Sequence, residues 1–143
     1  MSGLEERIER LEAAEELRAL LATYARVVDN DKDVNRLRDL FTADAALENP
    51  TRYEGRDAIL EYYLGVMQAL EASRHHVVNS SFEFETPTRV RHRGAFLAYV
   101  TRGGVTSLLC GDYDDEVVRG DDGRWRFRVK RNAIRVAHPL ATA

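Results

Sequence analysis

Two adjacent histidines, His75 and His76, are the side chains best suited to acid–base chemistry in this sequence. An imidazole titrates near neutral pH and becomes a stronger base when a carboxylate holds its second ring nitrogen. Neighbouring residues of a β-strand point to opposite faces, so only one of the two can face an interior pocket. The alternation that continues through Phe82 and Phe84 favours His76, whereas a semi-polar pocket around Asn79 favours His75. A hydrogen-bonded histidine without a chemical role is the alternative.

Asp29 and Tyr24 are candidates for the other groups of an acid–base site. Asp29 follows the apolar pair Val27-Val28, where its carboxylate can orient an imidazole, and Tyr24 lies about one and a half helical turns earlier. The two do not share an ideal helical face, so their joint use requires the helix to end between them. Otherwise Asp29 is a turn former and Tyr24 is a core aromatic residue.

Arg131 is the third charged residue with an expected role. In the last predicted strand, Trp125, Phe127 and Val129 alternate with cationic residues, and the same inward phase continues to Arg131. An arginine on an apolar face must pair with a carboxylate or reach a cavity, where its planar fork can hold an oxyanion. A structural ion pair, or a bulge that returns Arg131 to solvent, is the alternative.

Composition limits the class of protein. The 143 residues are 44% hydrophobic and 31% charged, which predicts one globular domain over residues 1–143. A net charge of -3 argues against a nucleic-acid partner. The single cysteine, Cys110, and the lack of a long apolar run favour a cytoplasmic protein without a membrane partner. Zinc-type spacings, nucleophile elbows and glycine-rich phosphate loops are missing, so we expect no metal and no cofactor.

Amphipathic patterns in the first half of the chain predict three helices. The first covers residues 4–28, the second begins at Val34 and includes Phe41, and the third follows Gly55. A cluster of turn-forming residues separates the first two, and a short extended segment is expected at 44–48.

The hydrophobic period changes from 3.6 towards 2 after Ser73, which predicts strands in the second half. They are expected at residues 75–85, 93–102, 105–119 and 124–136, with hairpin turns at 103–104 and 120–123. Helices followed by hairpin-linked strands predict an α+β fold with a mixed or antiparallel sheet. We expect this sheet to curve strongly into a cone that encloses a pocket together with the three helices.

The order and spacing of six segments carry a family resemblance. The segments are residues 16–29, 37–45, 53–59, 75–79, 111–116 and 123–127. Together they resemble the SnoaL-like branch of the nuclear-transport-factor-2-like (NTF2-like) superfamily, which includes scytalone dehydratase, bile acid 7α-dehydratase, hexachlorocyclohexane dehydrochlorinase and ketosteroid isomerase. The resemblance covers nearly the whole chain and implies the cone-shaped, cystatin-like α+β barrel of that group.

The resemblance also implies roles for the residues above. It assigns a base dyad to Asp29 and His75, because the family histidine commonly stands four residues before an asparagine, here Asn79. Tyr24 and Arg131 are similar to residues that polarise an oxygen or a leaving group in bile acid dehydratases. His76 is kept as the reserve base. The pocket is expected to bind substrate through His76, Tyr53, Tyr63, Phe41, Tyr113 and Trp125.

The function implied is that of a cofactor-independent lyase of the dehydratase type, acting on a hydrophobic, cyclic or polyketide-like small molecule. An isomerase or cyclase using the same pocket, or a noncatalytic small-molecule-binding or assembly domain, is the alternative. Outward apolar residues in 105–119 would supply the interface of a homodimer or homotrimer.

Overall fold

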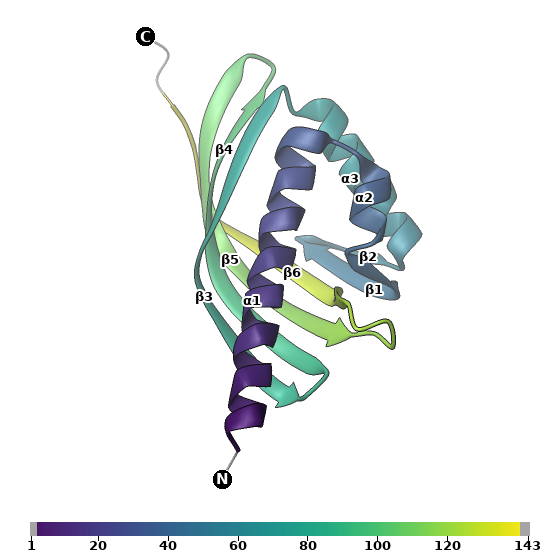
Figure 1. The fold of residues 1–143 in the computed structure, drawn as a ribbon. Coiled ribbons are helices and arrows are strands. Elements are labelled where there is room, and N and C mark those ends of the chain that lie inside the picture. The colour runs from purple at the N-terminus through teal and green to yellow at the C-terminus, as the bar shows by residue number, and fades with distance from the viewer. Residues whose placement is uncertain (1–2, 141–143) are drawn as a thin grey trace.

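A strongly curved, six-stranded sheet forms the body of the protein, and its helices pack on the concave side (Figure 1). This computed structural model describes residues 3–140. The strand order is β2-β1-β6-β5-β4-β3, in which β1 and β6 are parallel and the other neighbours are antiparallel. The expected α+β fold, with a strongly curved mixed sheet and three helices from the first half of the chain, is confirmed, and the sheet is not closed.

The elements follow one another in a simple order. They are α1 (Leu4–Arg26), the π-helical turn η1 (Val27–Asp31), α2 (Val34–Arg38), β1 (Phe41–Asn49), β2 (Thr51–Glu54), α3 (Arg56–Ala69), β3 (Ala72–Thr86), β4 (Arg89–Arg102), β5 (Val105–Arg119) and β6 (Trp125–Pro139). The predicted strand 105–119 has the observed bounds, whereas β3 and β4 begin three and four residues before the predicted starts at 75 and 93.

The first helix changes its winding before it ends. The α-helical part of α1 stops at Arg26, and the wider turn η1 continues to Asp31, followed by Lys32 in the left-handed conformation. A π-helical turn has five-residue spacing, so it rotates the following side chains relative to an α-helix. As a result, Tyr24 and Asp29 are both buried, although they do not share an α-helical face.

The second helix is shorter than predicted. It ends at Arg38, and Phe41 begins β1 instead of continuing the helix. Phe41 pairs with Phe127 in the parallel ladder between β1 and β6, and both rings are fully buried. Tertiary pairing therefore overrides the helical pattern of this segment.

A bulge in β3 reverses which residues face the helices. His75 and Val77 are on the inner face, opposite Ala98 and Phe96 of β4, but after Asn79 the inner positions are Ser80, Phe82 and Phe84. The ladder is interrupted between Val78 and Ser81, and Asn79 has a positive φ of 55°. The extra residue explains why the phenylalanines alternate in phase with His76 although His75 points inwards.

A second bulge, in β6, corrects the prediction for Arg131. Glu116 of β5 pairs with Val129, whereas the next residue, Val117, pairs with Phe127. The strand β6 thus advances by two residues where β5 advances by one. Because of this extra residue, Lys130 points into the core, where its side chain is fully buried, and Arg131 points towards the convex face. The expectation that Arg131 points inwards is wrong, because the alternation was continued across a bulge.

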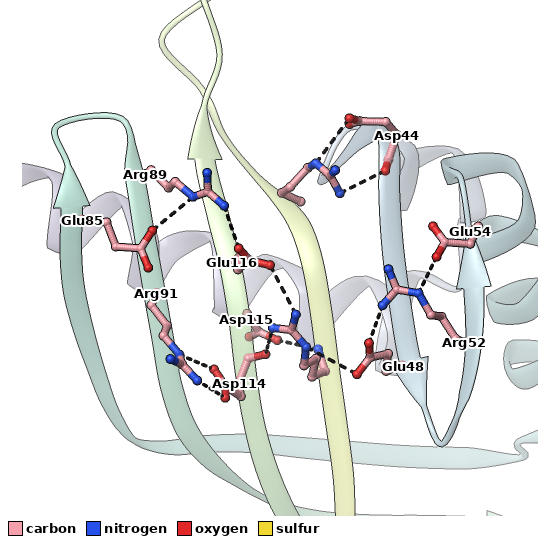
Figure 2. A network of polar contacts seen from close by, with 12 residues as sticks. Asp44, Glu48, Arg52, Glu54, Glu85, Arg89, Arg91, Asp114, Asp115 and Glu116 are labelled. Carbon is pink, nitrogen blue, oxygen red and sulfur yellow. Dashed lines mark hydrogen bonds and ion pairs between the residues drawn. The ribbon is translucent and has the colours of Figure 1, made fainter.

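Arg131 pairs with a network of charged residues, of which Figure 2 labels Glu48, Arg89 and Glu116. Its guanidinium lies 3.3 Å from Glu116 and 3.4 Å from Glu48, and Glu116 also binds Arg89 at 2.9 Å. Exposed ion pairs each contribute little, about 1 kcal/mol or less. Their collective effect is to keep this part of the sheet polar and hydrated.

Among the described helices, none is long and apolar enough to cross a membrane.

Candidate functional site

Asp29 and His75 form a hydrogen-bonded pair where η1 meets the start of β3. His75 Nδ1 lies 2.7 Å from Asp29 Oδ1, and the backbone N–H of His75 donates to Oδ2 at 2.6 Å. Ser73, on the same face of β3, donates its hydroxyl to Oδ1 at 2.7 Å. The exposed fraction of the side chain is 2% for Asp29 and 15% for His75. These contacts fix both the position and the orientation of the imidazole.

Two opposing effects act on the pKa of Asp29. Burial is the largest single effect and raises the pKa, while hydrogen bonds from His75 and Ser73 lower it. The hydrogen bonds together outweigh burial, so the pKa of Asp29 lies below its ordinary value. Asp29 is therefore ionised at neutral pH, and its carboxylate accepts a hydrogen bond from the Nδ1–H of His75. The lone pair on Nε2 is then the basic site of the ring.

A cavity of about 610 Å³ lies between α1, α3 and the concave face of the sheet, and His75 forms part of its wall. This volume is in the range typical of sites for small organic ligands. Most of the lining is apolar and includes Val28 of η1, Val66 and Leu70 at the end of α3, Phe96 of β4, Leu109 of β5 and Ile134 of β6. The arrangement places one imidazole beside a largely apolar chamber.

Two tyrosines provide a polar group in the same cavity. The hydroxyls of Tyr24 on α1 and Tyr63 on α3 are 2.7 Å apart and buried. Burial is the largest cause of the raised pKa of each phenol, and the hydroxyl–hydroxyl contact with Tyr63 raises the pKa of Tyr24 further. Both groups are therefore protonated at physiological pH. Only one proton is needed for the bond between them, so the other hydroxyl proton is available to a ligand.

Asn132 adds an unsatisfied acceptor to the cavity wall. Its side-chain Oδ1 is buried and has no hydrogen-bond partner among residues 3–140. A buried acceptor without a partner costs about 1–3 kcal/mol, so a bound donor would remove an existing penalty.

Lys130 packs against the rings of Tyr24 and Tyr113. Its ammonium group lies 3.8 Å from the ring centroid of Tyr113 and 4.4 Å from that of Tyr24. Burial lowers the pKa of Lys130, and Asp115, with an oxygen 3.5 Å away, opposes this shift. The inward cation expected near the end of the chain is thus present as Lys130, one residue before the predicted Arg131.

A second cavity, of about 630 Å³, lies between α1 and β3 on the opposite side of the dyad. Asp29 and His75 line it together with Arg18, Arg26 and His76. His76 therefore lines this second cavity and does not line the first. We refer to these spaces as the apolar cavity and the α1–β3 cavity.

The structure places the remaining predicted site residues in two groups. Tyr63 and Tyr113 line the apolar cavity, Tyr113 stacked on Phe96 with ring centroids 4.7 Å apart. Phe41 and Trp125 belong to the hydrophobic core and line neither cavity. Tyr53 packs against Tyr62, with ring centroids 4.7 Å apart, and is likewise outside the lining.

Several residues of the site were not predicted. Ser73 lies before the predicted strand at 75–85, and Asn132 lies within the predicted strand at 124–136 without a distinguishing pattern. Only the true start of β3 and the bulge in β6 would have indicated them. Lys130 was assigned to the outward phase for the same reason as Arg131. Among residues 3–140, no cluster of three or more His, Cys, Asp and Glu side chains is arranged to hold a metal ion.

Solved structures share this architecture over almost the whole chain. A candidate scytalone dehydratase from Novosphingobium aromaticivorans has 21% identity and a TM-score of 0.87, with 96% of this chain and 93% of that chain covered. A type 2 hexachlorocyclohexane dehydrochlorinase (LinA) has 23% identity and a TM-score of 0.86, covering 96% and 95%. The LinA type 3 enzyme from Novosphingobium barchaimii has 23% identity and a TM-score of 0.83, covering 96% of each chain. At these identities the likeness establishes the fold.

Comparison with curated proteins gives no match. The sequence itself matches the family model of the SnoaL-like domain over residues 9–131, a range that contains Tyr24, Asp29, His75 and Lys130. The family resemblance expected from the six sequence segments is therefore confirmed. The chain belongs to the SnoaL-like domain family.

Proposed function

We propose that this protein is a cofactor-independent lyase of the dehydratase type, in which His75 removes a proton from a substrate in the apolar cavity. The observation that carries the proposal is the position of His75, whose Nδ1 binds the buried carboxylate of Asp29 while its ring borders the cavity. The structural neighbours that are named as a dehydratase and as dehydrochlorinases support an elimination reaction.

The proposed reaction gives a role to the dyad and to the pair of tyrosine hydroxyls. His75 Nε2 takes the proton from a carbon next to a carbonyl group, and Asp29 stabilises the imidazolium that forms. The hydroxyl pair of Tyr24 and Tyr63 donates to the carbonyl oxygen, where negative charge develops. The electron pair then expels the hydroxyl group from the neighbouring carbon, and this group takes the proton from the His75 imidazolium and leaves as water.

The cavity also supports a proposal for the substrate class. Its volume and apolar walls suit a cyclic or polyketide-like molecule, and the unpaired Asn132 Oδ1 suits a ligand hydroxyl. A cyclic β-hydroxy ketone combines the acidic carbon, the carbonyl oxygen and the hydroxyl that these groups would contact.

The test uses a panel of cyclic β-hydroxy ketones incubated with the protein in D2O and followed by mass spectrometry. We expect exchange of the carbon-bound proton and loss of one water, and both should fall by about 10²-fold or more in His75→Gln. His76→Gln is the matched control, because the same substitution one residue away lies outside the apolar cavity, and it should retain activity. Equal activity in wild-type protein and folded His75→Gln would refute the proposal. Exchange with unchanged product mass would instead identify an isomerase.

A further inference from the structure

Ser80, His92 and Asp115 form a continuous hydrogen-bonded chain across three strands. Ser80 Oγ on β3 lies 2.9 Å from His92 Nε2 on β4, and His92 Nδ1 lies 2.8 Å from Asp115 Oδ2 on β5. His92 and Asp115 are fully buried, whereas Ser80 is part-exposed. The order hydroxyl, imidazole, carboxylate is the one that activates a serine nucleophile.

The contacts of Asp115 favour one direction for the two hydrogen bonds of this chain. Its Oδ1 accepts the backbone N–H of Arg131 at 3.1 Å, and the ammonium of Lys130 lies 3.5 Å from Oδ2. A carboxylate held in this way accepts the Nδ1–H of His92. His92 Nε2 is then the acceptor for the hydroxyl proton of Ser80.

The backbone is arranged to bring the hydroxyl and the imidazole together. The bulge at Asn79, with a φ of 55°, is what turns Ser80 to the inner face. Gly94 lies beside the contact, and a Cβ atom there would be 2.8 Å from His92 Nε2 and 3.1 Å from Ser80 Oγ. Any larger residue at position 94 would therefore displace one of the two groups. Strained or sterically demanding backbone of this kind often marks a functional site.

Ser80 is part-exposed and borders a cavity. Ser80 lines the α1–β3 cavity of about 630 Å³, which the proposed dehydratase reaction does not use. Arg18 lines the same cavity, and its guanidinium lies over the ring of Phe82, 5.4 Å from the centroid. Because Phe82 follows Ser80 on the inner face of β3, a cation borders the region where an oxyanion would form.

We propose that Ser80 is the nucleophile of a second site, which acts on small carboxylic esters. Ser80 Oγ attacks the carbonyl carbon while its proton passes to His92 Nε2, giving a tetrahedral oxyanion beside Arg18. Collapse breaks the bond to the alcohol oxygen, which leaves with the proton from His92, and an acyl-Ser80 remains. Water attacks the acyl group, gives a proton to His92, and releases the carboxylic acid as Ser80 recovers its proton.

A covalent probe tests the nucleophile without knowledge of the natural ester. Intact protein is treated with an alkyl fluorophosphonate, and the adduct is located by peptide mass spectrometry. We expect one adduct, on Ser80, which is lost in Ser80→Ala. The matched control is Ser81→Ala, which removes an adjacent hydroxyl from the opposite face and should be labelled at the wild-type rate. An unlabelled wild-type protein, or an adduct on another residue such as Ser73, would overturn the proposal.

Two further variants separate this site from the dyad. His92→Gln should be labelled at least about 10²-fold more slowly than wild type, with folding checked by circular dichroism. His75→Gln tests whether the dyad takes part, because His75 also lines the α1–β3 cavity. With 4-nitrophenyl acetate, acid-quenched wild-type protein should carry an acetyl group on Ser80. Ester hydrolysis that persists in Ser80→Ala and disappears in His75→Gln would assign the reaction to the dyad and refute the role of Ser80.

Discussion

The hydroxyl groups of Tyr24 and Tyr63 share one buried hydrogen bond of 2.7 Å, formed between α1 and α3. Tyr24→Phe and Tyr63→Phe each keep the ring packing, in which the two centroids are 5.9 Å apart, but leave the other hydroxyl without its partner. We expect each variant to lose about 1 kcal/mol of unfolding free energy. In the double variant the losses should be less than additive, as measured by urea denaturation. Additive losses would show that the hydroxyls do not interact.

The lowered pKa of Asp29 predicts a specific dependence of stability on pH. A carboxyl group whose pKa is lower in the folded state stabilises the fold above the unfolded pKa of about 4, and this contribution is lost as pH falls through the folded value. Wild type should therefore exceed Asp29→Asn in stability at pH 7, and the difference should shrink below about pH 4. Thermal unfolding of both proteins between pH 3 and 7 provides the measurement. A constant difference would contradict the assignment.

The two bulges explain which parts of the site could be predicted from the sequence. The alternation of apolar and polar residues correctly predicted strands over most of the second half. It does not show where a bulge inserts an extra residue. Asn79 is the only hint in β3, because asparagine tolerates a positive φ better than most residues. The extra residue at Asn79 shifts the alternation, and this shift is why the phenylalanines favoured His76 as the inward residue. Only the family resemblance resolved the choice in favour of His75.

Other parts of the site depend on tertiary contacts that no local pattern reports. The prediction for Arg131 failed because β6 has a bulge, and Phe41 became a strand residue through pairing with a segment more than 80 positions away. The contact of Tyr24 with Tyr63 and that of Asp29 with His75 join distant segments as well. The sequence supplied these residue types and their approximate elements, whereas the sheet determined their partners.

Asn79 itself gives a direct test of the β3 bulge. At a φ of 55°, glycine is unstrained and a β-branched residue is strongly disfavoured. Asn79→Gly should therefore be as stable as wild type or nearly so, while Asn79→Val should lose about 1–2 kcal/mol. Chemical denaturation of the pair isolates the backbone conformation, because the side chain of Asn79 is exposed. Equal stability of the two variants would argue against a positive φ.

Gly111 is expected to tolerate no side chain. A Cβ atom there would lie 2.2 Å from the carbonyl oxygen of Ala133 and 2.6 Å from the ring of Phe96. Gly111→Ala should destabilise the protein by about 3 kcal/mol through overpacking. Gly65→Ala in α3 is the control, since its Cβ would meet nothing within 4 Å. The higher helix propensity of alanine should stabilise that variant by up to about 1 kcal/mol. Comparable thermal stability of the two variants would contradict the close packing at Gly111.

The buried cation Lys130 and the exposed cation Arg91 should contribute very differently to the free energy of unfolding. Lys130→Met removes a fully buried ammonium group and leaves Asp115 with an unbalanced charge, so we expect a loss of about 3 kcal/mol. Arg91→Met breaks an exposed pair with Asp114, at 2.7 Å, and should cost less than about 1 kcal/mol. Urea unfolding at low and high salt tests both, and only the Arg91 effect should weaken with salt.

The position of β6 has a consequence for synthesis of the protein. This strand is translated after the other five, yet it lies between β1 and β5 in the sheet. While the ribosome is still making β6, the β1–β2 hairpin has no strand to pair with, and α1 cannot close over a complete sheet. Nascent chains that stop before Trp125 should therefore remain dependent on chaperones, and the domain should become protease-resistant only after β6 leaves the exit tunnel.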